Sequence, residues 1–321
     1  MPIETYLDKF KRLNVNTSGG HPSPHKPCML LALCDMAVAG ALRENKIYYE
    51  PNFLERYKSI FEVVKTVTDH ANPYFPFFHL RSEDFWHLKA REGKESVVQA
   101  LPTARSRKHI TENVDHVCLD EELFQLLQDT NNATIFKETI ISHWFPEKRQ
   151  AFERFYQSEL PEMNYENNLR GLVEQKDAKL SPTDYDKILR DRAFRKVIIE
   201  AYDYRCAASG WRIITPDDKV LVEAAHIVPF SKTHDDDPRN GIALTPTYHW
   251  AFDNRLIAPG TDLKWHVTKD LDPRIRDYEG LIGLEGKEIL LPKNKKYWPK
   301  KESLEWAIAN LNKLINPKLI I

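Results

Sequence analysis

Two histidines and an asparagine in the C-terminal half of the sequence carry side chains suited to proton transfer and metal binding. His226 follows an apolar stretch, Asn240 comes 14 residues later, beyond a polar loop, and His249 comes nine residues after that. A histidine can accept a proton near neutral pH because the unperturbed pKa of imidazole is about 6.5. Asp253 lies four residues after His249, on the same face of any helix that contains both. Taken alone, His226 would more often be a structural hydrogen-bonding residue.

The segments around these residues resemble the HNH nucleases. In that family the active site is a β-hairpin packed on a helix around one divalent metal ion. The resemblance covers about residues 190–310 and rests on these segments: EAAHIVPF, DDDPRNGIAL, TPTYHWAFDNRLIAP and ILLPKNKKYWPKKESLEWA. It implies a ββα-metal nuclease domain that hydrolyses phosphodiester bonds, with Mg²⁺ or Mn²⁺ as the cofactor.

This resemblance assigns a role to each of the four residues. His226 would be the general base that deprotonates the attacking water. Asn240 would hold the loop, and with it the base, in position, and we expect this uncharged partner to keep the base neutral, in contrast to a carboxylate. His249 would be a metal ligand, with Asp253 one turn further along the helix. The metal would hold the scissile phosphate and stabilise the leaving 3′ oxygen.

One position departs from the common HNH pattern. Many members carry an Asp or His as a metal ligand directly before the base, where this sequence has Ala225. The restriction-type branch shares the Ala-Ala-His pattern, so we do not interpret the site as inactive. Glu223 could supply the missing oxygen ligand. Strict strand alternation would place Glu223 on the opposite face from His226, so a bulge or twist would be needed.

Two other groups of potential metal ligands are interpreted as non-catalytic. The three successive acids Asp235–Asp237 are more typical of a solvated loop than of a metal cluster. The four cysteines form no C-x-x-C pair, which is typical of proteins in a reducing compartment. Some HNH relatives carry a further pair of metal-binding cysteines. The pattern Cys206-x-x-Ser209 cannot bind in that way, so we expect no structural zinc.

A second set of candidate binding residues lies in the N-terminal third. His25 and Lys26 stand just before a helix whose first backbone amides are unsatisfied, and such a terminus with two cations beside it suits a phosphate. The aromatic segment at 73–89, which we interpret as strand, combines apolar and cationic side chains: Phe75, Pro76, His79 and Arg81. An apolar surface rimmed by positive charge fits a ligand that is anionic yet partly hydrophobic. Core packing is the alternative role for these aromatic residues.

These N-terminal segments resemble the sulfur-binding domain of phosphorothioate-dependent type IV restriction enzymes, over about residues 1–147. The shared motifs are an H-K-P turn that opens a helix, an aromatic-Pro-Phe-aromatic strand and the triplet at 84–86, Asp-Phe-Trp. In that family one non-bridging oxygen of a DNA phosphate is replaced by sulfur, and the pocket binds that sulfur.

By this resemblance Phe75, Pro76 and His79 would line the sulfur cavity. The DNA backbone or nearby bases would be held by the cationic residues His25, Lys26 and Arg81. The family usually has Tyr at the position of Phe75 and a small residue at that of His79. Another DNA modification, such as a methylated or hydroxymethylated base, is therefore an alternative ligand.

Composition limits the class of protein. Among 321 residues, 46 Lys and Arg balance 47 Asp and Glu, so a nucleic-acid site must come from a local patch. No apolar run approaches the ~20 residues that span a bilayer, and the first ten residues lack the apolar core of a signal peptide. We therefore expect a cytoplasmic protein.

We predict an α+β protein with two domains. A mixed helix/strand domain that binds modified DNA would occupy residues 1–160, a polar linker 161–188, and the ββα-metal (HNH) nuclease domain with a C-terminal tail 189–321. Periodicity predicts helices at 28–40, 52–67, 120–129, 137–145, 147–160, 190–202 and 242–254, and strands at 219–230 and 256–267. The helix at 28–40 is apolar almost all the way round, so we expect it to be the buried central helix of the first domain.

The combined expectation is a modification-dependent restriction endonuclease that acts on double-stranded DNA in cellular defence. Because one HNH site cuts one strand, double-strand cleavage would favour a homodimer. The alternatives are an HNH nuclease that reads another modification, and a non-catalytic DNA-binding defence protein. Ala225, at the ligand position, is the feature that favours the non-catalytic alternative.

Overall fold

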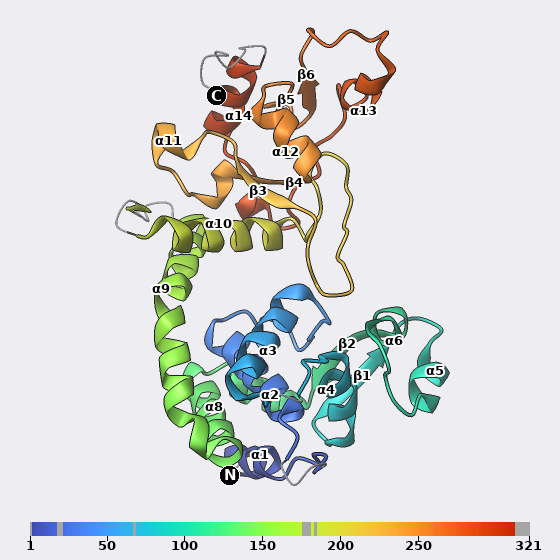
Figure 1. Ribbon diagram of the computed structural model, residues 1–321, viewed down its shortest axis with the longest axis vertical. Helices are drawn as coiled ribbons and strands as arrows, with labels where there is room; N and C mark the ends of the chain where they lie inside the picture. Colours follow the sequence, from blue (N-terminus) through green and yellow to red (C-terminus); the bar gives the residue numbers. More distant parts are fainter. Residues whose placement is uncertain (1, 18–21, 67–68, 175–180, 183–184, 312–321) are drawn as a thin grey trace. The chain divides into compact units, whose positions relative to one another are not determined.

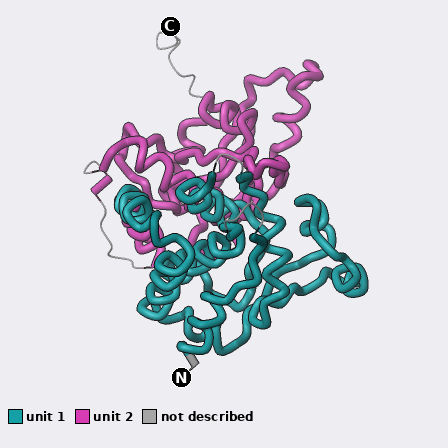
Figure 2. The backbone as a smooth tube through the Cα atoms, turned by 60° about the horizontal axis from the view of Figure 1, so that its bottom comes forward, with its two compact units in different colours: residues 1–158 teal, residues 159–321 magenta. Residues whose placement is uncertain are grey.

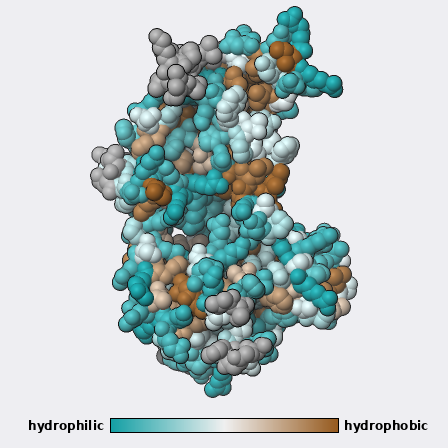
Figure 3. Space-filling model, in the orientation of Figure 1, coloured by the Kyte–Doolittle hydropathy of each residue, from teal (hydrophilic) through white to brown (hydrophobic). Residues whose placement is uncertain are grey.

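Figure 1 shows the computed structural model of the chain, which describes residues 2–17, 22–66, 69–174, 181–182 and 185–311. The chain divides into two compact units, Met1–Ser158 and Glu159–Ile321 (Figure 2). Each unit has its own hydrophobic core, and hydrophilic side chains cover most of the face seen in Figure 3. None of the helices in the described ranges is long and apolar enough to cross a membrane.

The first unit is mostly helical and contains one two-stranded antiparallel sheet, β1 paired with β2. Its elements, in chain order, are α1 (Pro2–Lys11), α2 (His25–Val38), α3 (Pro51–Val64), α4 (Tyr74–His79), β1 (Trp86–Ala90), α5 (Glu95–Ala100), α6 (Arg107–Asn113), β2 (Val114–Leu119), α7 (Glu121–Leu127) and α8 (Thr130–Trp144).

Helix α2 is the centre of this unit. Its residues from Cys28 to Cys34 are all completely buried, because the helix is apolar on every side and packs against α3, α4 and α8. Pro27 is its third residue, in the first turn, where a missing backbone N–H costs nothing. The prediction of a buried central helix is thereby confirmed.

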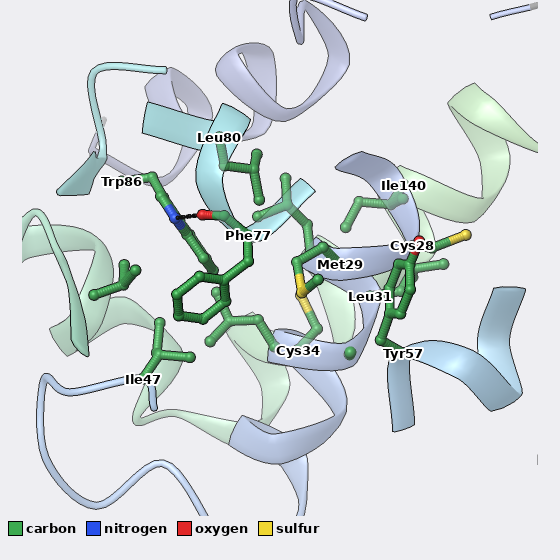
Figure 4. Packing of buried hydrophobic residues seen from close by; sticks show 14 of the residues in the cluster. Cys28, Met29, Leu31, Cys34, Ile47, Tyr57, Phe77, Leu80, Trp86 and Ile140 are labelled. Carbon is green, nitrogen blue, oxygen red and sulfur yellow. Dashed lines mark hydrogen bonds between the residues drawn. The ribbon is translucent and has the colours of Figure 1, made fainter. Parts of the chain in front are cut away.

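The aromatic segment predicted as strand instead begins with the helix α4, and only Trp86–Ala90 is extended. Pro73 precedes α4 and Pro76 lies in its first turn, and both lack the N–H that a strand ladder needs. Phe77 and Phe78 are completely buried, so they belong to the core. The indole N–H of Trp86 donates to the carbonyl of Phe77 at 2.9 Å and fixes α4 against β1 (Figure 4). The aromatic residues of this segment favour strands, but their packing in the core outweighs that preference and the segment begins as a helix.

Helix α9 (Arg149–Glu174) includes the first half of the predicted linker. Phe152 is buried in the core of the first unit, whereas Tyr165, Leu169 and Val173 are buried in the core of the second. Their four-residue spacing puts them on one apolar face of the helix. The segment 161–174 was predicted as a linker because most of its residues are polar. Residues 175–180 and 183–184 of that linker, and 312–321 of the predicted tail, lie outside the described residues.

The second unit contains two further antiparallel strand pairs, β3 with β4 and β5 with β6. Its elements, after α9, are α10 (Lys187–Ala201), β3 (Glu223–His226), α11 (Phe230–Thr233), β4 (Gly241–Leu244), α12 (Pro246–Asp253), β5 (Ile257–Pro259), β6 (Trp265–Val267), α13 (Glu279–Ile282) and α14 (Lys301–Asn310). The helix predicted at 242–254 begins only at Pro246, because its first residues pair with β3 instead.

A glycine lets the β3–β4 hairpin lie close to α10. Gly241 is the register partner of His226, and a Cβ at this position would lie 2.3 Å from Ile198 Cδ1 and 2.9 Å from Phe194 Cζ. Ile198 and Phe194 are themselves buried, so neither side chain has room to withdraw. The absence of a side chain at Gly241 therefore allows Phe194 to lie against the end of β3, where His226 is located.

Candidate functional site

A cavity of about 490 Å³ in the second unit brings together residues from β3, α10 and α12. Four residues predicted from sequence line it, Glu223, His226, His249 and Asp253, and Arg195 joins them from α10. Asn240, the fifth predicted residue of this site, does not line the cavity. Strand β3 and helix α12 therefore bring one imidazole from the strand, and an imidazole and a carboxylate from the helix, to the same cavity.

His226 is held by one hydrogen bond and one ring contact. Its Nε2 lies 2.7 Å from Oδ1 of Asp236, and its ring stacks on Phe194 with centroids 3.9 Å apart and planes at 2°. Because an ionised carboxylate only accepts hydrogen bonds, Nε2 carries the hydrogen. In the described part of the chain Nδ1 has no hydrogen-bond partner, so this nitrogen is available to accept a proton.

The acidic loop is not solvated, contrary to the interpretation from sequence. Asp236 is 2% exposed and Asp237 is 8% exposed. Asp236 Oδ2 accepts hydrogen bonds from the Tyr165 hydroxyl at 2.6 Å and from Arg190 at 3.1 Å. The expectation that the base would have only an uncharged partner is also wrong, because that partner is the carboxylate of Asp236.

Asn240 fastens the loop that connects β3 to β4. Its side chain is completely buried and makes four hydrogen bonds: Nδ2 donates to the carbonyls of Val228 and Asp235, while Oδ1 accepts from the Val228 amide and the Ser303 hydroxyl. All of its hydrogen-bonding groups are therefore used inside the protein. This arrangement suits a residue that positions the loop and does not touch a substrate.

Three possible metal-binding side chains interact with one another in the cavity. Nδ1 of His249 donates to Oε2 of Glu223 at 2.8 Å, and its Nε2 lies 3.5 Å from Oδ2 of Asp253. Glu223 thus reaches the cavity that His226 lines, although they are three residues apart on one strand. Strand twist and a long flexible side chain account for this difference from strict alternation.

The donor set fits a hard divalent ion completed by substrate and water. No three His, Cys, Asp or Glu side chains among the described residues form a ready-made metal cage. Mg²⁺, however, usually takes only one or two carboxylates from the protein and fills the remaining positions with phosphate oxygens and water. An imidazole and a carboxylate 3.5 Å apart beside an open cavity match that requirement.

Sequence reasoning missed Arg195. It is an exposed side chain of α10 that lines the same cavity, and none of the described residues forms an ion pair with it. The predicted helix at 190–202 was treated only as a scaffold. The spacing of His226 and Arg195 along the sequence gives no sign that the two meet, so no local signal would have found this residue.

A second cavity, of about 600 Å³, lies in the first unit. It is lined by five of the six residues predicted to bind modified DNA: His25, Lys26, Phe75, Pro76 and His79. Arg81 does not line it. The Arg81 guanidinium donates to the carbonyls of Val98 and Leu101 at 2.9 and 2.6 Å and lies 4.0 Å from the Phe78 ring centroid.

The two basic residues Lys26 and His25, which line this second cavity and were predicted to bind DNA, both have partners inside the protein. Lys26 forms an ion pair with Glu83 at 2.5 Å and donates to Ser82 at 2.8 Å. His25 bonds to Ser23 through Nδ1, and its Nε2 lies 3.1 Å from the carbonyl of His70, so Nε2 carries the hydrogen. Burial lowers the pKa of His25.

The rim of this cavity is aromatic. Phe75 is 39% exposed, and its ring stacks on His79 with centroids 5.8 Å apart and planes at 16°. Burial lowers the pKa of His79, and the charges of Lys26 and Arg81 lower it further. The cavity therefore presents apolar rings and an uncharged imidazole at neutral pH.

Comparison with known proteins finds that a segment of each unit matches a family model. Residues 3–152 match the family described as ScoMcrA-like, DNA sulfur-binding domain, and residues 206–258 match the family described as HNH endonuclease. A solved structure, the modification dependent TagI restriction endonuclease, is similar with 20% identity and a TM-score of 0.29, covering 39% of this chain and 39% of that chain. The chain thus spans about two fifths of the length of that structure. No curated protein matches the sequence.

Proposed function

We propose that this chain, in which a DNA sulfur-binding domain precedes an HNH endonuclease domain, is a modification-dependent restriction endonuclease. It binds phosphorothioate-modified duplex DNA through its first unit and hydrolyses nearby phosphodiester bonds in its second. The observation that carries this proposal is the single cavity lined both by a proton acceptor, His226, and by an imidazole and carboxylate pair, His249 and Asp253.

Selectivity for sulfur follows from the chemistry of the cavity in the first unit. An ordinary phosphate oxygen needs hydrogen-bond donors, whereas sulfur is larger, more polarisable and a weaker acceptor. Phe75 and Pro76 offer an apolar surface, and the charge of Lys26 is already balanced by Glu83. A hydrophobic pocket discriminates such small changes by about 1–3 kcal/mol. The remaining affinity must come from salt-dependent phosphate contacts that carry no sequence information.

In the second unit His226 accepts a proton from the attacking water through Nδ1. Asn240 holds the loop that follows His226 in place through its hydrogen bonds to the backbone of Val228. His249 and Asp253 would hold a divalent ion, Mg²⁺ or Mn²⁺, which supplies stabilisation for the charge that develops at the leaving 3′ oxygen. Glu223 accepts the Nδ1 hydrogen of His249 and so directs Nε2 towards Asp253.

Arg195 completes the site as a contact for the scissile phosphate. Arg195 lines the cavity from α10, and a guanidinium group can bind two phosphate oxygens at once. Water attack in this arrangement leaves a 5′ phosphate and a 3′ hydroxyl. Cleavage of both strands requires two such sites, so we propose that the active form is a homodimer.

Two plasmids of identical sequence, one with phosphorothioate linkages and one without, test this proposal. We expect nicking and linearisation of the sulfur-containing plasmid in Mg²⁺ or Mn²⁺, little cleavage of the unmodified plasmid, and no cleavage after chelation. Equal cleavage of both plasmids would contradict the assigned ligand. Tight binding to the modified plasmid without cleavage in any divalent ion would instead indicate a non-catalytic reader.

A further inference from the structure

We propose that Asp236 is a positioning residue for hydrolysis, one that holds His226 in the tautomer required of a general base. This inference rests on the proposed nuclease function. Asp236 does not line the cavity of the second unit that His226 lines, so it acts on the substrate only through His226.

The contact between Asp236 and His226 fixes both the ring plane and the position of its hydrogen. Oδ1 of Asp236 lies 2.7 Å from Nε2, so the hydrogen resides on Nε2 and the lone pair on Nδ1. Phe194 stacks on one face of the imidazole, and the Phe230 ring centroid lies 5.9 Å from that of the imidazole. A flip of the ring within its plane would lose the hydrogen bond, and a turn out of the plane would also lose the parallel stack.

The carboxylate of Asp236 is itself fixed by two donors on its other oxygen. Tyr165 from α9 and Arg190 from α10 both donate to Oδ2. The Arg190 side chain is 8% exposed, and its guanidinium lies 3.6 Å from the Phe230 ring centroid. Every oxygen of this buried carboxylate is therefore hydrogen-bonded, and its charge is balanced by Arg190. Such full pairing is what a buried charge requires.

Replacing Asp236 with asparagine reverses the hydrogen-bond pattern. An asparagine side chain has one accepting oxygen and one donating nitrogen. Because Arg190 can only donate, the amide oxygen of Asp236→Asn must turn towards Arg190 and Tyr165. The amide nitrogen then faces Nε2 of His226 and donates to it, so the imidazole hydrogen moves to Nδ1 and the base is lost. The analogous substitution in the Ser-His-Asp triad selects the wrong tautomer and costs about 10⁴-fold in kcat.

The test compares single-turnover cleavage of phosphorothioate DNA by four forms of the 321-residue chain: the wild type, Asp236→Asn, His226→Ala and the double variant. We expect Asp236→Asn to lower the cleavage rate by about 10²–10⁴-fold while the Kd for modified DNA stays unchanged. We further expect the double variant to cleave no more slowly than His226→Ala, because Asp236 acts only through that ring. Additive losses in the double variant would overturn the proposal.

A second readout observes the tautomer directly. In ¹⁵N-histidine NMR spectra we expect the hydrogen of His226 on Nε2 in the wild type and on Nδ1 in Asp236→Asn. The signal of His226 is assigned by its disappearance in His226→Ala. The same tautomer in both proteins would overturn the proposal.

Removing Arg190 keeps the test valid if Asp236→Asn alone does not fold. In the double variant Arg190→Met/Asp236→Asn no buried charge is left unpaired, since the other partner of Arg190, Asp191, is exposed to solvent. The Tyr165 hydroxyl can then accept from the amide. The amide oxygen can then face Nε2, so we expect roughly tenfold or greater recovery of activity over Asp236→Asn. We expect the matched variant Arg190→Met/Asp236→Leu, which has no acceptor for Nε2, to stay inactive. Equal activity of these two double variants would contradict the assignment.

Discussion

The ammonium group of Lys26 lies 2.5 Å from a carboxylate oxygen of Glu83, and their side chains are only 9% and 11% exposed. Lys26 lines the cavity of the first unit, so under the proposed function a DNA phosphate that entered it would meet a cation whose charge is already balanced. An oxygen with a full negative charge is stabilised less by such a site than by a free lysine. We interpret the ion pair as a device that weakens binding of unmodified DNA.

The substitution Glu83→Gln removes that counter-charge. We expect it to tighten binding of unmodified DNA by roughly three- to tenfold and to reduce the preference for phosphorothioate DNA. The plot of log Kd against log salt concentration should become steeper by about one phosphate contact. Fluorescence anisotropy titrations at several salt concentrations measure both effects. Glu92→Gln, which removes an exposed charge elsewhere in the same unit, is the control, and an equal effect of that substitution would contradict the interpretation.

Phe75 forms the apolar rim of the same cavity. We expect Phe75→Ala to lower the preference for sulfur-containing over unmodified duplexes by roughly tenfold, because the apolar surface that favours sulfur is removed while the phosphate contacts stay. Competition binding with duplexes that differ only in the modification measures this ratio. Tyr48 is exposed to a similar extent, 41% against 39% for Phe75, and it does not line the cavity. Tyr48→Ala should leave the ratio unchanged, and an equal fall in both variants would place selectivity elsewhere.

Arg195 and Arg192 provide a matched pair on one helix. Both are exposed residues of α10. Of the two, Arg195 lines the cavity of the second unit and Arg192 does not. We expect Arg195→Gln to lower the single-turnover cleavage rate by roughly a hundredfold, as does the loss of a donor to developing negative charge. Arg192→Gln should retain nearly full activity in the same assay. Similar rates for the two variants would remove Arg195 from the site.

The stability of the protein should depend on pH through His25. Burial lowers the pKa of this histidine in the folded state, whereas in the unfolded chain it is about 6.5. Below about pH 6.5 the unfolded chain therefore binds a proton that the folded protein does not, so the free energy of unfolding decreases as pH falls towards the lowered pKa. Above that range His25 contributes no pH dependence. Urea titrations at several pH values should show that the free energy of unfolding decreases less with falling pH in His25→Gln than in the wild type. The same dependence of the free energy of unfolding on pH in both proteins would refute this explanation.

The residues that could be found from sequence are those whose local pattern reports their environment. The apolar composition around Cys28–Cys34 indicated a buried helix, and the spacing of His226, Asn240 and His249 indicated a hairpin and helix. Both patterns are local consequences of how a helix or a hairpin buries its side chains.

The features that were missed depend on contacts between distant parts of the chain. Asp236 can be buried because Arg190, 46 residues away, balances its charge and Tyr165, 71 residues away, donates a hydrogen bond to it. The acidic loop itself contains no sign of either residue. Helix α4 formed in an aromatic segment because its side chains fit the core around α2 and its prolines disfavour a strand. Likewise, Lys26 could be predicted at the cavity, but its partner Glu83 is 57 residues away.

We propose that recognition and hydrolysis are performed by different parts of the chain. The variant His226→Ala separates the two, with cleavage and binding of the same phosphorothioate duplex measured on one protein preparation. We expect cleavage to fall by about 10²–10⁴-fold or more while the Kd for the modified duplex, and its preference over the unmodified one, stay as in the wild type. Undiminished cleavage, or loss of cleavage and of selective binding together in a folded protein, would show that the two functions are not divided in this way.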